Sequence, residues 1–299
     1  MINVANVTKT FGDFKALDNL SLNVQKGSVY GLIGPNGAGK TTIIKSLIGV
    51  YTQDDGVILI DGKEVFENIL LKENIIYISD ELYFFSTYSI DQMAKFYSGI
   101  YKNWSWERYE SLKEIFKIET NRKVRRLSKG MQKQVAFWLG ICAQPEVMIL
   151  DEPVDGLDPV MRRNVWKMIL QDVAERQLTV LVSSHNLREL EDICDHVGIM
   201  YKGQVVLEKS LDDAKGNIHK VQLAFEGEYP QEIFKKINVL HTESIGRVHM
   251  IIAKGDGDKI KESIMEFNPL ICDILPLSLE EVFIYELGGM GYELENIII

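Results

Sequence analysis

The chain has 299 residues, 46% of them hydrophobic, and a formal net charge of −10 at pH 7. This is an ordinary globular composition, with room for one large domain and a small one. No apolar run approaches the ~18–20 residues of a membrane span, and the N-terminus lacks the regions of a signal peptide, so we expect a soluble, cytoplasmic chain. The acidic balance argues against a general nucleic-acid surface.

The three cysteines, Cys142, Cys194 and Cys272, are odd in number and far apart. This spacing favours reduced, mostly buried thiols over a disulfide or metal framework.

The first predicted elements are two strands, 2–8 and 16–24, on either side of a turn at Gly12-Asp13. Phe11 lies beside this turn, where an exposed ring could stack on a flat base. Taken alone, however, Phe11 is more readily explained as a packing residue.

The strand-like run 28–33 leads into a segment that matches the phosphate-binding pattern G-x-x-x-x-G-K-[ST] at every fixed position. Glycines let backbone N–H groups point at phosphate oxygens, Lys40 brings a charge to the β- and γ-phosphates, and Thr41 offers Mg²⁺ a hydroxyl. Helical spacing over 42–48 places the phosphates at a helix N-terminus. A glycine-rich turn without a ligand would not require this strand, helix and Lys-Thr pair. The predicted loop residues are Gly34, Pro35, Asn36, Gly37, Ala38, Gly39, Lys40, Thr41 and Thr42.

Short strands are expected at 56–60 and 75–78, the second ending in Ser79, Asp80 and Glu81. Eleven of the 28 aromatic residues then fall between Tyr77 and Tyr109, around predicted helices at 90–100 and 106–116. This helical insertion is either a small aromatic core or a docking surface for a partner, and both can hold.

Ser128 is a natural N-cap for a helix predicted at 132–141. A buried strand from Val147 ends on Asp151 and Glu152, and another from Thr179 ends on His185. Ligands bind at the carboxyl ends of such parallel strands, so these side chains are expected to face one cleft.

From Gly216 onward the chain carries 7 Lys/Arg and 14 Asp/Glu, a net of −7, which leaves −3 for the preceding residues. We therefore predict two domains, 1–215 and 216–299. The second has a β-α-β-β-α-β order, the split βαβ arrangement, over 219–225, 230–237, 239–244, 248–253, 258–267 and 270–275. A last helix, 278–287, starts with a capping box at Ser278. This domain is either a regulatory or dimerising module or a stabilising appendage.

Together these motifs resemble the nucleotide-binding subunit of ATP-binding cassette (ABC) transporters over about residues 1–215. The resemblance implies an α/β P-loop NTPase core with an N-terminal antiparallel β subdomain and a helical signature subdomain at about 81–137, here followed by a small ferredoxin-like α+β domain. It implies that Phe11 stacks on adenine, that Asp151 supports Mg²⁺, that Glu152 polarises the attacking water and that His185 contacts the γ-phosphate of ATP. Gly156-Leu157-Asp158 resembles the loop that communicates across a dimer.

Two positions depart from the family pattern. In the signature segment 127–131, Lys129 and Met131 replace Gly and Gln, while Ser128 and Gly130, which would meet the partner's γ-phosphate, are kept. Asp80 stands where a glutamine usually touches Mg²⁺ and senses the permease. The form of residues 77–81 resembles a branch of bacterial ATPases tied to antibiotic-response exporters.

The resemblance implies an ATPase that closes as a homodimer or heterodimer on ATP and Mg²⁺. It would drive a separate permease, in the exporter direction, from the inner face of the membrane, and would bind no nucleic acid. A soluble ABC ATPase acting on nucleic acid or ribosomes is the alternative, although one phosphate loop and no heptad run disfavour it. A nucleotide-binding regulator without turnover is a third reading, which Glu152 and His185 argue against.

Overall fold

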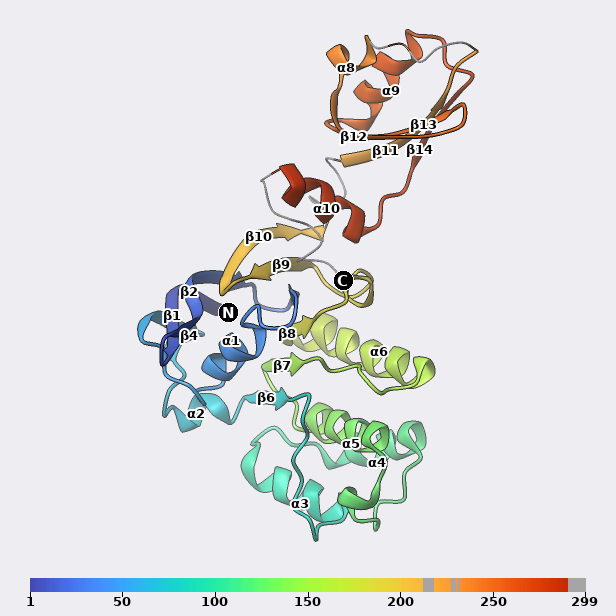
Figure 1. Cartoon of the computed structure of the whole chain (residues 1–299). Helices are drawn as coiled ribbons and strands as arrows, with labels where there is room; N and C mark the ends of the chain where they lie inside the picture. The colour runs from blue at the N-terminus through green and yellow to red at the C-terminus, as the bar shows by residue number, and fades with distance from the viewer. Residues whose placement is uncertain (212–217, 227–229, 231, 290–299) are drawn as a thin grey trace. The chain divides into compact units, whose positions relative to one another are not determined.

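The structure is a computed structural model that describes residues 1–211, 218–226, 230 and 232–289 (Figure 1). The chain divides into two compact units. The first unit comprises Met1–His185 and Ile193–Glu208, and the second comprises Asn186–Asp192 and the chain from Lys209 onward. The boundary predicted at 215/216 lies outside the described residues.

The first unit begins with an antiparallel sheet in the order β2-β1-β4-β5. Its strands are β1 (Ile2–Phe11), β2 (Phe14–Val24), β4 (Asp55–Ile60) and β5 (Lys63–Glu64). The predicted turn joins β1 to β2, and burial alternates from Leu20 to Val24 of β2, as expected where a sheet has one core face; register shifts interrupt the alternation in β1. The predicted strands are thus present, and β1 and β2 are longer than predicted.

A six-stranded sheet in the order β10-β9-β3-β8-β7-β6 forms the centre of the unit. The strands are β3 (Val29–Ile33), β6 (Ile75–Ile78), β7 (Val147–Asp151), β8 (Thr179–Ser184), β9 (His196–Tyr201) and β10 (Gln204–Ser210). The pairs β3-β8, β3-β9, β6-β7 and β7-β8 are parallel. Every residue of β3, β7 and β8 is buried, as expected for parallel strands covered on both faces. The carboxyl ends of these strands therefore meet at one edge.

Helix α1 (Lys40–Leu47) lies between the two sheets. Its buried residues, such as Ile43 and Ile44, share one core with Leu17 and Leu20 of β2 and with Ile149 of β7. This packing fixes the start of α1 at the carboxyl end of β3. The short helix α2 (Ile69–Lys72) follows β5.

The helical part contains α3 (Ile90–Ile100), α4 (Trp106–Phe116), the 3₁₀ turn η1 (Val124–Arg126) and α5 (Lys129–Cys142), and α6 (Pro159–Arg176) follows β7 (Figure 1). The predicted bounds of α3 and α4 are confirmed. Helix α5 begins three residues before the predicted start, because the Ser128 side chain accepts a hydrogen bond from the backbone N–H of Met131 and caps Lys129 as the first residue.

The aromatic residues of the insertion form a continuous array. Its inner end is buried, where Tyr109 stacks on Trp138 with ring centroids 4.9 Å apart. Its outer end is exposed, where Tyr83 is 85% exposed and meets Phe85 edge-on. The aromatic-core prediction is therefore confirmed for the inner end.

The second unit has the split βαβ order predicted for it. Its sheet runs β12-β13-β11-β14 with antiparallel neighbours, formed by β11 (Ile218–Ala224), β12 (Asn238–Ile245), β13 (Val248–Lys254) and β14 (Ile271–Leu275). Helices α8 (Ile233–Lys236) and α9 (Gly257–Met265) contribute to a core that includes Ile233 and Ile264. Of the helix predicted at 230–237, the described residues include α8.

Two further elements belong to this unit. The turn η2 (Leu187–Glu189) contacts α10 (Leu279–Gly289). The predicted capping box of α10 is present: the backbone N–H of Glu281 donates to Ser278 Oγ (3.3 Å), and the backbone N–H of Ser278 donates to Glu281 Oε2 (3.0 Å).

The cysteines are free thiols, with Cys142 and Cys194 buried and Cys272 half-buried. Burial raises the pKa of Cys142 to about 12 and holds the pKa of Cys194 well above its usual range. Among the residues that the structure describes, no helix combines the length and the apolar character that a membrane crossing requires.

Candidate nucleotide site

The phosphate-binding segment forms the turn between β3 and α1. Gly39 has φ of 106°, a left-handed conformation that favours glycine, and it occupies the N-cap of α1. No side chain caps this helix, so its first backbone N–H groups are free of side-chain acceptors. A helix start of this kind is suited to an anion.

Lys40 is held across this turn. Its side chain is 6% exposed, and Nζ donates to the carbonyl oxygens of Gly34 (2.5 Å) and Pro35 (3.3 Å). The same Nζ lies 3.5 Å from Glu152 Oε1. The lysine thus connects the phosphate loop to the carboxylate at the end of β7.

A cavity of 330 Å³ opens over the loop. It brings together residues from the first hairpin, the phosphate loop and the ends of β6 and β7. Its walls are Phe14, Ala16, Pro35, Asn36, Gly37, Gly39, Lys40, Thr41, Thr42, Asp80, Asp151 and Glu152. Ten of the predicted residues, Pro35 of the loop included, are in this set; Phe11, Gly34, Ala38, Ser128, Gly130 and His185 are not.

Asp151 is buried at the end of β7, and a serine of β8 supports it. The register places Asp151 opposite Ser183, whose hydroxyl donates to Asp151 Oδ1 (2.6 Å) and accepts from the backbone N–H of Glu152 (3.1 Å). Ser183 therefore orients both carboxylate residues. Nearby on β6, burial and then the charge of Asp151 raise the pKa of Tyr77 to about 12, so its phenol stays protonated.

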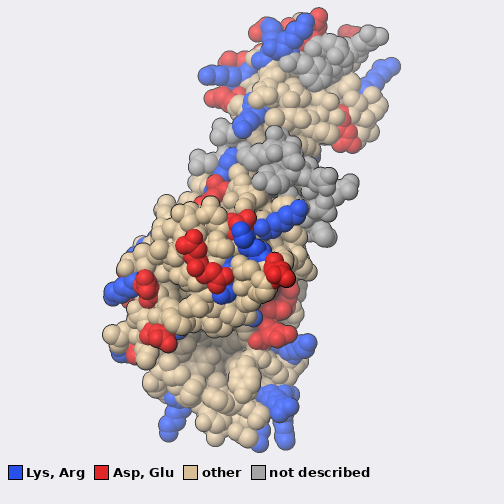
Figure 2. All heavy atoms as spheres, turned by 60° about the vertical axis from the view of Figure 1, so that its left-hand side comes forward, with Lys and Arg blue, Asp and Glu red and all other residues tan. Residues whose placement is uncertain are grey.

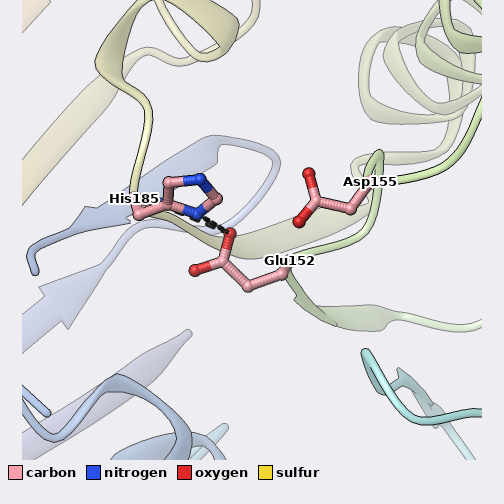
Figure 3. A group of neighbouring side chains, drawn as sticks. All are labelled: Glu152, Asp155 and His185. Carbon is pink, nitrogen blue, oxygen red and sulfur yellow. Dashed lines mark hydrogen bonds and ion pairs between the residues drawn. The ribbon is translucent and has the colours of Figure 1, made fainter. Parts of the chain in front are cut away.

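Glu152 has φ of 46°, a strained value for a residue with a side chain, so the chain turns sharply after β7. Its Oε2 accepts from the backbone N–H of His185 (3.3 Å) and lies 2.9 Å from His185 Nδ1. Figure 3 shows Asp155 turned toward this pair, and one ligand atom from each of the three lies within 4.8 Å of the others. The group could hold a divalent ion, although the contacts between Glu152 and His185 explain its grouping without one.

The aromatic residues of the first hairpin are divided between two places. Phe11 and Phe14 are directly opposite in the register of β1 and β2. Phe14 is 63% exposed and lines the cavity, whereas Phe11 meets Tyr51 edge-on at 5.2 Å. Sequence reasoning missed Phe14, although its place two residues after Gly12 was a usable signal.

The signature residues lie beside the turn that follows β7. Gly130 packs so closely against Gly156 that a Cβ at position 130 would come within 2.6 Å of the Gly156 carbonyl oxygen. Asp80, at the carboxyl end of β6, lines the nucleotide cavity, and its Oδ1 lies 3.4 Å from Nζ of Lys133 on α5. Sequence reasoning missed Lys133 as well as Ser183.

Phosphate loop, buried aspartate and turn-held glutamate at the edge of a parallel sheet define a P-loop nucleoside-triphosphate hydrolase. The family model described as ABC transporter matches residues 17–155. The ABC transporter ATP-binding protein YtrB of Bacillus subtilis (strain 168) is 31% identical over 97% of this chain and 99% of its own length.

Two further comparisons agree. The bacitracin transport ATP-binding protein BcrA of Bacillus licheniformis is 30% identical over 97% of this chain and 98% of its own. A solved structure of the ATP-binding subunit of an ABC transporter superposes with a TM-score of 0.68 at 26% identity, over 72% of this chain and 92% of that one. The chain belongs to the family of ABC transporter ATP-binding proteins, and its reaction is the hydrolysis of ATP.

Proposed function

We propose that the chain hydrolyses Mg-ATP as one half of a head-to-tail pair of cassettes and thereby drives a separate membrane permease in the export direction. The observation that carries the proposal is the cavity that joins the phosphate loop to Asp151 and Glu152. The names of two relatives support a role in transport, since BcrA is described as a bacitracin transport ATP-binding protein and SrtF of Streptococcus pyogenes as a lantibiotic transport ATP-binding protein.

The residues of this chain have separate parts in the reaction. The backbone N–H groups at the start of α1 and the ammonium of Lys40 neutralise charge on the transferred phosphoryl group. Glu152 orients the water for in-line attack, and His185, hydrogen-bonded to Glu152, reaches the γ-phosphate. Phe11 is the proposed adenine-stacking ring, and Phe14 is a second candidate on the same hairpin.

The donor atoms on the cavity wall fit Mg²⁺. Asp151 and the hydroxyl of Thr41 offer oxygen ligands, which a hard cation prefers, and Ser183 leaves Asp151 Oδ2 available, whereas the carboxylate of Asp80, expected from its position to reach Mg²⁺, lies against Lys133. When bound, Mg²⁺ supplies positive charge to the β- and γ-phosphate oxygens.

A second cassette is needed because the signature residues do not line the nucleotide cavity of their own chain. Ser128 caps α5 and Gly130 packs against Gly156, and neither residue is in the lining of the cavity. We propose that they meet the γ-phosphate bound by a second copy or by a related cassette, so that ATP holds the two together.

The exposed end of the aromatic array is the proposed docking surface for the permease, which would hold the chain at the inner face of the membrane. Tyr83, Phe85 and Phe96 are exposed there, and aromatic residues are enriched at interface centres. Nucleic acid is disfavoured on the face shown in Figure 2, because the described Lys and Arg side chains lie in separate groups there and form no continuous stripe.

Tyr83→Glu tests the docking surface. We expect this substitution at an 85% exposed position to abolish co-purification of the membrane subunit while basal ATPase activity stays within about twofold of the parent, because the ring lies outside the nucleotide cavity.

Phe66→Glu is the matched control, since Phe66 is also an exposed aromatic residue but lies outside the insertion. Loss of the permease in both variants, or in neither, contradicts the assignment. Tight, salt-sensitive binding of DNA or RNA would favour the nucleic-acid alternative instead.

A further inference from the structure

Lys133 is a buried cation in the middle of the helix that carries the signature residues. Its side chain is 5% exposed. An ammonium group has three N–H donors, and Nζ has three acceptors: the carbonyl oxygens of Glu152 (2.8 Å) and Asp155 (3.2 Å) and Oδ1 of Asp80 (3.4 Å). The donor capacity of Lys133 is therefore fully used by the two loops that border the nucleotide cavity.

Two of these acceptors hold the turn that presents the catalytic carboxylate. They are the backbone carbonyls of the first and last residues of the turn 152–155. Glu152 sits at φ of 46°, a conformation that persists only where the surroundings impose it. Ser183 fixes the N–H of Glu152 from β8, and Lys133 fixes its carbonyl from α5. The backbone of Glu152 is thus held from both sides.

The third acceptor, Asp80, supplies the negative charge that balances the ammonium group of Lys133. The two acceptor carbonyls are neutral, and Asp80 is the one carboxylate in ion-pair distance of Lys133 among the described residues. The two partners differ in environment, because the Asp80 side chain is 59% exposed and that of Lys133 is not. Removing Asp80 would leave the buried ammonium without a counter-ion, which weakens the contacts that Lys133 makes with the turn.

We propose that Lys133 is a positioning residue for Glu152, and that the Asp80–Lys133 ion pair couples the loop after β6 to the catalytic turn. Displacement of Asp80 weakens the hold of Lys133 on the turn 152–155 and slows hydrolysis without loosening bound nucleotide. The inference rests on the proposed role of Glu152 as the residue that orients water. It gives the aspartate at position 80 a function that a neutral side chain cannot perform, because only a carboxylate balances the buried ammonium.

The test compares Lys133→Gln, Asp80→Asn and the double variant in the full chain, with turnover measured at saturating Mg-ATP and ATP affinity measured separately. We expect each single variant to lower kcat by roughly 10- to 100-fold, the scale of a misplaced catalytic group, with ATP affinity within about twofold of the parent. Because both act through one link, the double variant should be no slower than Lys133→Gln alone.

Glu81→Gln is the control: it removes a neighbouring exposed carboxylate that has no ion pair in the part of the chain described, and it should leave kcat unchanged. The proposal is overturned if Lys133→Gln turns over like the parent, or if the two kcat losses multiply in the double variant. If Lys133→Gln does not fold, the kcat of Asp80→Asn is compared with that of Glu81→Gln. Equal kcat values for these two variants would contradict the link between Asp80 and the catalytic turn. An active Glu152→Gln would instead overturn the proposed function.

Discussion

Glu152 is the residue on which turnover depends most directly. We expect Glu152→Gln to keep ATP binding and to lower kcat by about 10²–10⁴-fold, because the amide retains the shape of the side chain but cannot accept a proton from water. Steady-state phosphate release and equilibrium ATP binding measure the two effects. Turnover equal to that of the parent would show that another group orients the water.

Some residues of the candidate site can be recognised from a sequence motif, whereas others can be recognised only from contacts in the folded structure. Lys40, Asp151 and Glu152 were predicted because the loop pattern and the polar ends of apolar strands place them at one sheet edge. Ser183 reads as a polar residue within an apolar strand, and its role follows only from its pairing with Asp151. Lys133 likewise appears in no motif, since its acceptors lie 19 and 22 residues further along the chain.

At the scale of elements, a matched pair of glycine substitutions can test the contact between α5 and the turn after β7. Gly130→Ala places a Cβ within 2.6 Å of the Gly156 carbonyl oxygen, whereas a Cβ at Gly99 of α3 has nothing within 4 Å. Both changes favour a helix, by up to about 1 kcal/mol. We expect Gly130→Ala to be less stable than Gly99→Ala by roughly 1–3 kcal/mol in the free energy of unfolding, because only the first is overpacked.

Chemical denaturation of both variants measures this difference, and the ATPase rate adds a second readout. Gly99→Ala should equal the parent in rate, while Gly130→Ala should be slower because the displaced carbonyl belongs to the turn beside the site. Equal free energies of unfolding would mean that α5 and this turn can move apart without cost to accommodate the added Cβ.

Elements with clear ends were the predictable ones. Helices α3 and α4 were located correctly because Ser89 and Ser105 cap apolar segments of helical spacing. The start of α5 was misplaced because Gly130 and Met131 disrupt the apolar spacing, although Ser128 already marked the cap. In the second unit the order of elements was predicted better than their lengths: α8 is short, but the split βαβ order is as predicted.

At the scale of the whole molecule, the proposal of a paired cassette predicts association that depends on ATP. The Glu152→Gln chain should sediment as a dimer at saturating ATP and at lower mass without it, because nucleotide that is not hydrolysed keeps the two signature segments engaged. Ser128→Arg should abolish this response, since the arginine would occupy the place of the phosphate contact at the start of α5. A monomer at saturating ATP, or a Ser128→Arg variant that still responds, contradicts the paired arrangement.

The division into two units could be predicted only in part. The change in charge and pattern indicated a C-terminal domain, but residues 186–192 join the second unit although they follow β8 of the first, and this depends on tertiary packing such as the contact of η2 with α10. The pair Arg188 Nε and Glu280 Oε2, 2.9 Å apart, is one such contact. The matches to YtrB and BcrA extend over 97% of the chain and so include this region.

The buried thiols give the protein a low chemical background for labelling. The nucleophile in alkylation is the thiolate, and both cysteines of the first unit, Cys142 and Cys194, are buried with raised pKa values. A maleimide would therefore react slowly with them, leaving half-buried Cys272 as the native thiol to replace. With Cys272→Ser, a single cysteine introduced on an exposed loop would carry a fluorophore or spin label at one known position, and the opening and closing of the cassettes could be followed without rebuilding the core.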